Sequence, residues 1–459
     1  MLCRRPDAHG TSRALMLAIT LALGVVVSST QAWSTQAWPQ VPSPVCSAKG
    51  ITLCVLPDET APVVEIVLRI PAGAADDPAD AAGAAHLLEH LLLLHAPDLA
   101  PVAEHGNAFV SAVATPYVAT TSAREALDVV DALLAVFRTP AFTAEALARE
   151  RTAILRERET RRASPQSRIA ARIGATLLGG SPLGRDPIGT REDVEALRLE
   201  DAIAFHAAHY RADEAVLVVG GDVRPEVLQA RVAEVLGTAE ARPKPPLSLE
   251  PVPPAAERVA IVSADPAIGA PERILAALVR FPDDAAGSAA VGLLLDYLTS
   301  DLPGAPRPTL EAQEDALLRA VGFGASRLAP GWTAFEIRLA ARPGVPADAL
   351  DRLEAVVRAR LAEIAREGLD REILVRLSQR AVSRARAAQA RPVGTSVALA
   401  EWTAAGRDLA SWETRPETAA AVAPAEIAAI ARALATAHRL VAADLLPETT
   451  RQPETRREP

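Results

Sequence analysis

Hydrophobic residues follow two periods along the first half of the chain, one typical of strands and one typical of helices. Short runs rich in β-branched residues predict three strands, at 51–56, 63–70 and 215–223. Apolar positions three and four residues apart predict four helices, at 81–94, 124–137, 143–162 and 225–237. Because these elements alternate without the regular spacing of βαβ units, we expect an α+β domain with an antiparallel sheet flanked by helices.

A proline-rich segment separates this half from a second one of similar length. Residues 241–256 contain six prolines, which can continue neither a central strand nor a helix. The same order of elements then restarts, with strands at 258–262, 274–281 and 334–341 and helices at 288–297 and 347–367. We therefore expect two similar α+β halves, at 46–240 and 257–447, consistent with an internal duplication. The polar tail 448–459 is predicted to be disordered.

The first residues have the form of a secretory signal peptide. Arg4, Arg5 and Arg13 precede an apolar run at 14–27, and small residues up to Ala32 follow it. The run is shorter than the roughly 20 residues that cross a bilayer. We expect cleavage near Ala32, rather than an uncleaved anchor, and then a linker at 33–45. This predicts a secreted or periplasmic protein without a stable membrane span.

The composition narrows the range of partners. Of the 459 residues, 49% are hydrophobic, which suffices for a core and excludes a mainly disordered chain. Aromatic residues make up only 3%, so a surface that stacks nucleic-acid bases is not expected. The 48 basic and 57 acidic residues give a net charge of −9, so no overall field attracts nucleic acid.

Two of the three cysteines remain after signal cleavage. Cys46 and Cys54 flank a predicted hairpin, VCSAKGITLCV, whose turn lies near Gly50. In an oxidising compartment, cysteines placed in this way come within reach of a disulfide. The alternative is that they are two small, half-buried strand residues.

The sequence His86-Leu87-Leu88-Glu89-His90 carries the strongest chemical signal. On a helix, positions i and i+4 project from one face, so His86 and His90 can bind one metal ion through their imidazoles. Glu89 lies on the same side and can take a proton from a water molecule on that metal. The order H-x-x-E-H is the inverzincin signature. Coincidence on an amphipathic helix is the alternative, and a third ligand decides between the two.

A second helix offers that ligand. Glu150 and Glu157 lie seven residues apart, on one face of the helix at 143–162. A single glutamate in so charged a helix is usually solvated. Combined with the two histidines, however, one carboxylate completes a His₂Glu site and leaves a fourth position for water.

HLLEH together with ERTAILRE resembles the pitrilysin/insulinase family (M16) of zinc metallopeptidases. Its half-sized members include the mitochondrial processing peptidase subunits and bacterial proteases. GNAFVSAVATPY, SPLGRDPIGTREDVEAL and AVLVVGGDV also fit segments of this family. The similarity is strong over about residues 47–240, and in the second half it lies mainly in the order of elements. It implies two α+β halves in a clamshell-type half-subunit.

The resemblance also implies roles for individual residues. His86, His90 and Glu157 would bind one zinc ion, Glu89 would be the general base, and Glu150 would support the metal from its outer shell. Asn107 and Ala108 would lie on the edge strand that pairs with the backbone of a peptide substrate. The expected activity is therefore that of an exported zinc endopeptidase.

Three departures from the family pattern stand out. His90 and Glu157 are 67 residues apart, about ten fewer than usual, so the helix after His90 is shortened and His95 and His105 are expected in loops. Val110 replaces a usual threonine. In active full-length members, the second half supplies an arginine and, some seven residues later, a tyrosine that polarises the scissile carbonyl. Here Arg319 is present, but no tyrosine follows it.

The missing tyrosine leaves two readings of the function open. In the first reading the chain is a peptidase. It is then either weak on its own or active as a dimer, including a heterodimer in which a homologous subunit supplies the Arg/Tyr pair. Alternatively, it is a non-catalytic scaffold or peptide-binding subunit of such a heterodimer.

Overall fold

The computed structural model describes residues 45–48, 50–237, 258–314, 316–391 and 393–448. The expected signal peptide at 1–32 and the proline-rich linker at 241–256 lie outside these residues. So do the linker at 33–45 and the tail at 448–459, apart from residues 45 and 448. The domain boundaries proposed from the sequence therefore remain predictions.

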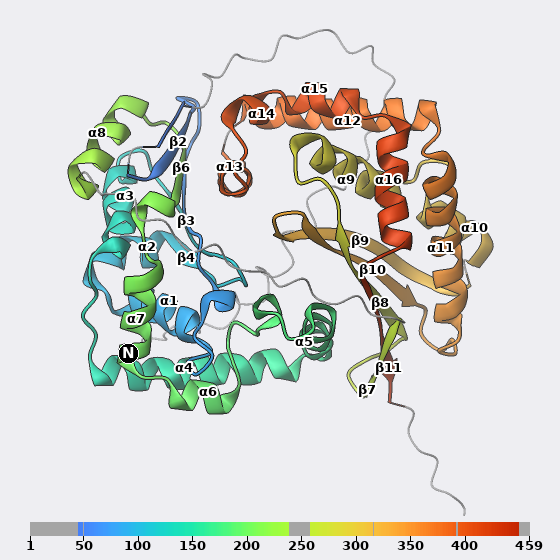
Figure 1. The fold of residues 1–459 in the computed structure, drawn as a ribbon, viewed down its shortest axis with the longest axis horizontal. Helices are drawn as coiled ribbons and strands as arrows, with labels where there is room; N and C mark the ends of the chain where they lie inside the picture. The colour runs from blue at the N-terminus through green and yellow to red at the C-terminus, as the bar shows by residue number, and fades with distance from the viewer. Residues whose placement is uncertain (1–44, 49, 238–257, 315, 392, 449–459) are drawn as a thin grey trace, which may run out of the picture. The chain divides into compact units, whose positions relative to one another are not determined.

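The first half contains a six-stranded sheet (Figure 1). Its order is β1 (Val45–Ala48), β2 (Thr52–Pro57), β6 (Val216–Gly221), β3 (Val64–Ile70), β5 (Thr115–Thr121) and β4 (Gly106–Ala108). The α+β class is confirmed, but the sheet is mixed and not purely antiparallel, because β2 and β6 run parallel. The chain between these two strands is long and largely helical, and such a connection can deliver a strand in either direction.

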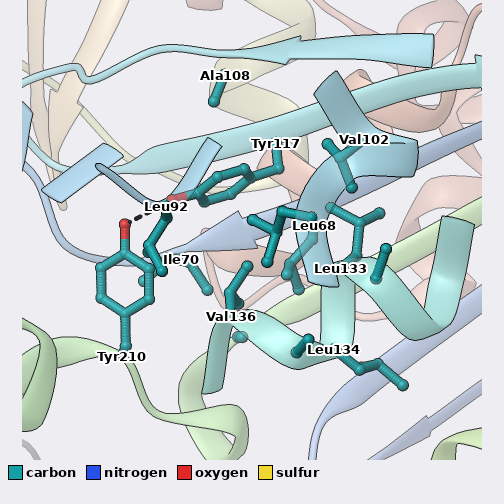
Figure 2. Packing of buried hydrophobic residues seen from close by; sticks show 14 of the residues in the cluster. Leu68, Ile70, Leu92, Val102, Ala108, Tyr117, Leu133, Leu134, Val136 and Tyr210 are labelled. Atoms are coloured by element: carbon teal, nitrogen blue, oxygen red, sulfur yellow. Dashed lines mark hydrogen bonds between the residues drawn. The ribbon is translucent and has the colours of Figure 1, made fainter. Parts of the chain in front are cut away.

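Eight helices of the first half are described: α1 (Ala84–His95), α2 (Ala100–His105), α3 (Ala126–Leu134), α4 (Ala144–Ala163), α5 (Pro165–Leu178), α6 (Arg191–Ala196), α7 (Leu199–His209) and α8 (Pro225–Leu236). The core lies between one sheet face and helices that include α1, α3 and α7. Figure 2 shows Leu68 of β3 packed near Leu133 of α3, and Ile70 of β3 near Leu92 of α1. The helix that carries the H-x-x-E-H sequence is therefore anchored along the sheet.

The second half repeats this topology. Its sheet has the order β7 (Val259–Asp265), β11 (Arg439–Pro447), β8 (Glu272–Arg280), β10 (Trp332–Ala341) and β9 (Leu318–Ala329). The parallel pair is β7–β11, and the other neighbours are antiparallel. Strand by strand, this matches the order β2, β6, β3, β5, β4 and places the parallel pair at the same position. The expectation of two similar halves is thus confirmed in the connectivity of the sheets.

Helices cover this second sheet as well (Figure 1). The α-helices described in the second half are α9 (Ala285–Leu298), α10 (Pro306–Glu314), α11 (Ala349–Glu367), α12 (Arg371–Ala390), α13 (Ser396–Ala404), α14 (Leu409–Glu413), α15 (Arg415–Ala421) and α16 (Pro424–Ala435). Helices α9, α11 and α16 pack their apolar residues against one sheet face. In the described part of the chain no single helix has the length and apolarity of a membrane span, although the bent pair α15–α16 meets these criteria jointly.

Each half covers the second face of the other half's sheet. Leu399 and Ala400 of α13 and Trp412 of α14 pack on β2, β3 and β6. In return, Ile169 and Ile173 of α5 pack in one cluster with β8 and β11. Polar contacts fix the first of these interfaces: Arg69 donates to Glu401 at 2.8 Å. Each sheet is therefore covered by its own helices on one face and partly by the other half on the second face, while β7 and β9 keep exposed residues.

Candidate metal centre

The H-x-x-E-H sequence lies in the first half of α1, where the helix is buried. His86 and Glu89 are each 5% exposed, and one face of α1 directs them, together with His90, to a common point. The centroids of the two imidazole rings are 4.6 Å apart. Among the described residues, these three side chains form a cluster whose potential ligand atoms all lie within 4.8 Å of one another.

Glu157 on α4 completes the cluster. Its Oε2 lies 3.5 Å from Nε2 of His86 and 3.6 Å from Nε2 of His90. Two ligands of one tetrahedral zinc ion, each about 2.0–2.1 Å from the metal, are separated by about 3.3 Å. The carboxylate oxygen of Glu157 thus lies from each imidazole nitrogen at nearly the spacing that one zinc ion requires, although the two helices are far apart in sequence. Two imidazoles and one carboxylate also form a donor set that zinc accepts in catalytic sites.

The electrostatics of the metal-free cluster favour a cation. Burial opposes the charge of His90, but the carboxylates of Glu157, Glu89 and Glu150 outweigh it and raise the pKa of His90 to about 9. The hydrogen bond with His90, aided by the charge of Arg161, lowers the pKa of Glu157 to about 2. The site is therefore negative enough to hold a proton on a buried imidazole, and a bound metal ion would meet the same field.

The pKa values of the remaining two residues of the motif shift mainly through burial. Burial lowers the pKa of His86 to about 4, and the neighbouring His90 acts in the same direction. His86 is therefore neutral near pH 7, as a metal ligand must be. Burial raises the pKa of Glu89 to about 7. A carboxylate whose pKa lies near neutrality can both accept and return a proton.

Glu150 lies behind the cluster, seven residues or about two helical turns before Glu157 on α4. Its Oε2 lies 3.0 Å from Nδ1 of His90, and its Oε1 lies 2.7 Å from Nε2 of His95.

The structure corrects the expectation that His95 and His105 lie in loops. His95 is the last residue of α1, and His105 is the last residue of α2. The run of leucines extends α1 for another turn, and Pro97 disfavours helical backbone at Ala96, where α1 stops.

A second group of residues, which the sequence did not reveal, fixes the start of α1. Asp77 accepts hydrogen bonds from the backbone N–H groups of Gly83, at 2.7 Å, and Ala85, at 2.8 Å. Gly83 has φ +91°, and a Cβ there would lie 3.1 Å from the carbonyl oxygen of Ile188. Arg185 donates to the backbone carbonyl of Asp77. The segment SPLGRDPIGT thus braces the helix that carries the two histidines.

The same segment also contacts the second ligand-bearing helix. The guanidinium of Arg158 on α4 donates to the carbonyl of Gly189 at 3.1 Å. Both helices that bring carboxylates and imidazoles together are therefore tied to one loop. No helical or strand period in the sequence connects the segment SPLGRDPIGT to the histidine and glutamate cluster. Only the resemblance to the family indicated that this segment matters.

The expected substrate-binding strand lies at an edge of the first sheet. In β4, Asn107 is exposed and Ala108 is buried, and among the described strands β4 pairs with β5 alone. The other side offers backbone groups with which an extended peptide can pair.

The arginine considered for catalysis lies in the second half, on β9. Arg319 is exposed and forms an ion pair with Glu272. All three tyrosines are buried elsewhere: Tyr117 and Tyr210 share a hydrogen bond of 3.0 Å (Figure 2), and Tyr297 accepts one from Arg360. No tyrosine of this chain is therefore placed at its surface to polarise a substrate carbonyl.

Two family models match the chain in succession. The model of insulinase (peptidase family M16) matches residues 53–191, and that of the peptidase M16 inactive domain matches residues 196–380. The first match contains the whole histidine and glutamate cluster.

Curated relatives match about two fifths of the chain. A probable mitochondrial-processing peptidase subunit beta of Schizosaccharomyces pombe is 28% identical over 200 residues, which cover 42% of this chain and 44% of that protein. An uncharacterized zinc protease of Mycobacterium tuberculosis is 30% identical over 185 residues, which cover 38% of this chain and 42% of that protein. The matches thus span less than half the length of these relatives.

Solved structures agree with the fold over most of the chain. A protease from Helicobacter pylori has a TM-score of 0.77 and 17% identity, covering 89% of this chain and 100% of that one. The first half of the periplasmic protease PqqL from Escherichia coli has a TM-score of 0.70 and 16% identity, covering 89% and 92%. At these identities the likeness concerns the fold alone.

Proposed function

Since this chain belongs to the insulinase family of peptidases, M16, we propose that it is a zinc-dependent endopeptidase that cleaves peptides or unfolded segments. The observation that carries the proposal is the convergence of His86, His90 and Glu157, from two helices, on one point beside Glu89. A binding module has no need of a buried, nearly neutral carboxylic acid next to a metal site. A hydrolase that activates water does need one.

In the proposed mechanism, the three ligands hold the metal and Glu89 moves the proton. Zinc bound here supplies Lewis-acid activation of water and of the scissile carbonyl. Glu89 accepts the proton of the attacking water and returns it to the leaving amine, a cycle that suits a pKa of about 7. Asn107 and Ala108 on the edge strand β4 would hold the substrate backbone in an extended form.

A glutamine substitution tests the proposed base. Glu89→Gln should abolish peptide hydrolysis while zinc stays bound, because both histidines and Glu157 remain. The measurements are the zinc content and the chelator-sensitive cleavage of a mixed peptide library. Glu104→Gln, an exposed glutamate on α2, is the matched control and should leave both unchanged. Retained hydrolysis in Glu89→Gln would refute the assignment, and loss of zinc would make Glu89 a ligand.

We also propose that the protein acts outside the cytoplasm after cleavage near Ala32. The structure joins Cys46 and Cys54, which lie opposite each other on β1 and β2, in a disulfide. Such bonds are typical of oxidising compartments. Amino-terminal sequencing of protein recovered from a secreting host tests the proposal: a start near residue 33 supports it, and an intact Met1 in the cytoplasm contradicts it.

The second candidate function is that of a subunit that depends on a homologous partner. It is favoured by the burial of all three tyrosines, which leaves no tyrosine hydroxyl to assist Arg319. An oxyanion donor contributes roughly 10²–10³ in rate. In this form of the proposal, the partner supplies an Arg/Tyr pair and forms a 1:1 complex with this chain.

The partner hypothesis has a direct kinetic test. The purified chain should bind zinc but cleave peptides slowly, and a homologous subunit without H-x-x-E-H but with the Arg/Tyr pair should raise the rate roughly 10²-fold. Full activity of a monomer or homodimer would contradict the need for a partner. Absence of cleavage with every homologous subunit would favour a scaffold role.

A further inference from the structure

We propose that His95 is a positioning residue for the metal centre, which acts on His90 through Glu150. The inference rests on the proposed function and goes beyond it, because His95 contacts Glu150, which is not one of the proposed ligands. It was expected in a loop and outside the ligand set. The structure instead places it one turn beyond His90 on α1, with its Nε2 2.7 Å from Oε1 of Glu150.

Glu150 is held at both of its carboxylate oxygens. Nδ1–H of His90 donates to Oε2 at 3.0 Å, and Nε2–H of His95 donates to Oε1. The carboxylate is 5% exposed, so little water can replace either donor. The two hydrogen bonds, one to each oxygen, therefore fix the carboxylate in one plane.

This arrangement determines the state of the His90 ring. Because Nδ1 donates to Glu150, the lone pair of the neutral ring resides on Nε2, the atom that faces Glu157 at 3.6 Å. Nδ1 of His86, in contrast, is buried without a hydrogen-bond partner. The orientation of His86 thus depends on packing, whereas that of His90 depends on Glu150. Outer hydrogen bonds of this kind typically change metal affinity 10–100-fold.

His95 matters because a carboxylate with one free oxygen can rotate about its bond. Without a donor at Oε1, Glu150 would turn that oxygen toward other donors or water, and its bond to His90 would change with it. His95 removes this freedom at the cost of ordering one side chain at the end of α1. The residue thus completes a chain of contacts that runs His95, Glu150, His90.

The test compares zinc affinities by competition with a chelator. His95→Leu removes the donor and should weaken zinc binding by roughly fivefold or more, less than the 10–100-fold expected for Glu150→Gln. His95→Gln places an amide N–H near the Nε2 position and should stay within about twofold of wild type. His105→Leu, at the end of α2, is the matched control and should have no effect, since His105 is not among the partners of Glu150.

A double mutant separates positioning from general destabilisation. If His95 acts through Glu150, then His95→Leu should cause no further loss of affinity in a Glu150→Gln background. Thermal unfolding of the metal-free variants verifies that they are folded. Should His95→Leu fail to fold, His95→Asn, whose shorter amide does not reach Oε1 from the same position, replaces it.

Several results would overturn the inference. They are wild-type affinity in His95→Leu, an equal loss in His95→Gln and His95→Leu, or a full additional loss in the double mutant. A wild-type chain that takes up no zinc would remove both the metal site and this inference. A chain that binds zinc with the predicted pattern but cleaves no peptide would refute only the proposed function.

Discussion

Glu157→Gln tests whether α4 supplies the third metal ligand. The substitution keeps the shape of the side chain and removes the charge that lies 3.5 Å and 3.6 Å from the two imidazole Nε2 atoms. Changes even beyond the ligands cost 10–100-fold in affinity, so loss of a direct ligand should weaken zinc binding at least tenfold. A tenfold change corresponds to about 1.4 kcal/mol of binding free energy.

The assay is the zinc content at equilibrium with a competing chelator. Glu159→Gln is a matched control two residues along α4, where the side chain is 57% exposed and pairs with Arg191 at the surface. An exposed ion pair contributes roughly 0–1 kcal/mol and should not influence the metal. Equal zinc content in wild type and Glu157→Gln would show that the carboxylate is not a ligand, and that the 67-residue spacing misled the assignment.

Three further predictions concern the scaffold of the metal-free protein. Burial raises the pKa of Asp77 from 3.8 to about 6, so the stability that it contributes is fully present below the unfolded pKa and is lost as the pH rises through 6. In thermal unfolding, the stability of wild type relative to Asp77→Asn should fall by about 2 kcal/mol between pH 4 and 7, and a constant difference would contradict this. Replacing Cys46 and Cys54 by serine should lower the free energy of unfolding by about 2–3 kcal/mol, because the disulfide closes a short loop, with a sequence separation of 8, in the unfolded chain. The zinc affinity should not change. Gly83→Ala should destabilise the protein by roughly 1–3 kcal/mol in chemical denaturation, because φ is +91° and the new Cβ approaches Ile188; unchanged stability would refute this strain.

Local periodicity was sufficient to predict the helix that carries His86, Glu89 and His90 on one side, because positions i and i+4 share a face wherever α1 lies. It could also align Glu150 and Glu157 on one face of α4. It could not show that the two helices meet, since this depends on packing across the sheet and on the loop around Arg185. The resemblance to a family supplied that step.

The features that escaped prediction depend on distant contacts. Asp77 caps α1 from six residues before Gly83, through a turn that has no helical or strand period. His95 looked like a loop residue because the chain between His90 and Glu157 is short, yet the leucine run keeps it helical. Strand β11 was not predicted. Its sequence follows α11 only after five further helices, far from the strands with which it pairs, and only the assembled sheet shows that it lies between β7 and β8.

The exchange of covering helices between the halves has a consequence for the order of folding. The face of β2, β3 and β6 that carries Cys54 and Val218 is covered by residues as distant as Trp412, in a chain of 459. Until that part has been synthesised, the half with the proposed metal centre presents an apolar sheet surface to its surroundings, a surface prone to aggregation. A gene fragment that ends at the proline-rich segment would therefore encode all the proposed metal ligands yet lack the helices that cover this face of its sheet. We therefore expect the metal centre to form late in folding, after the second half has been synthesised.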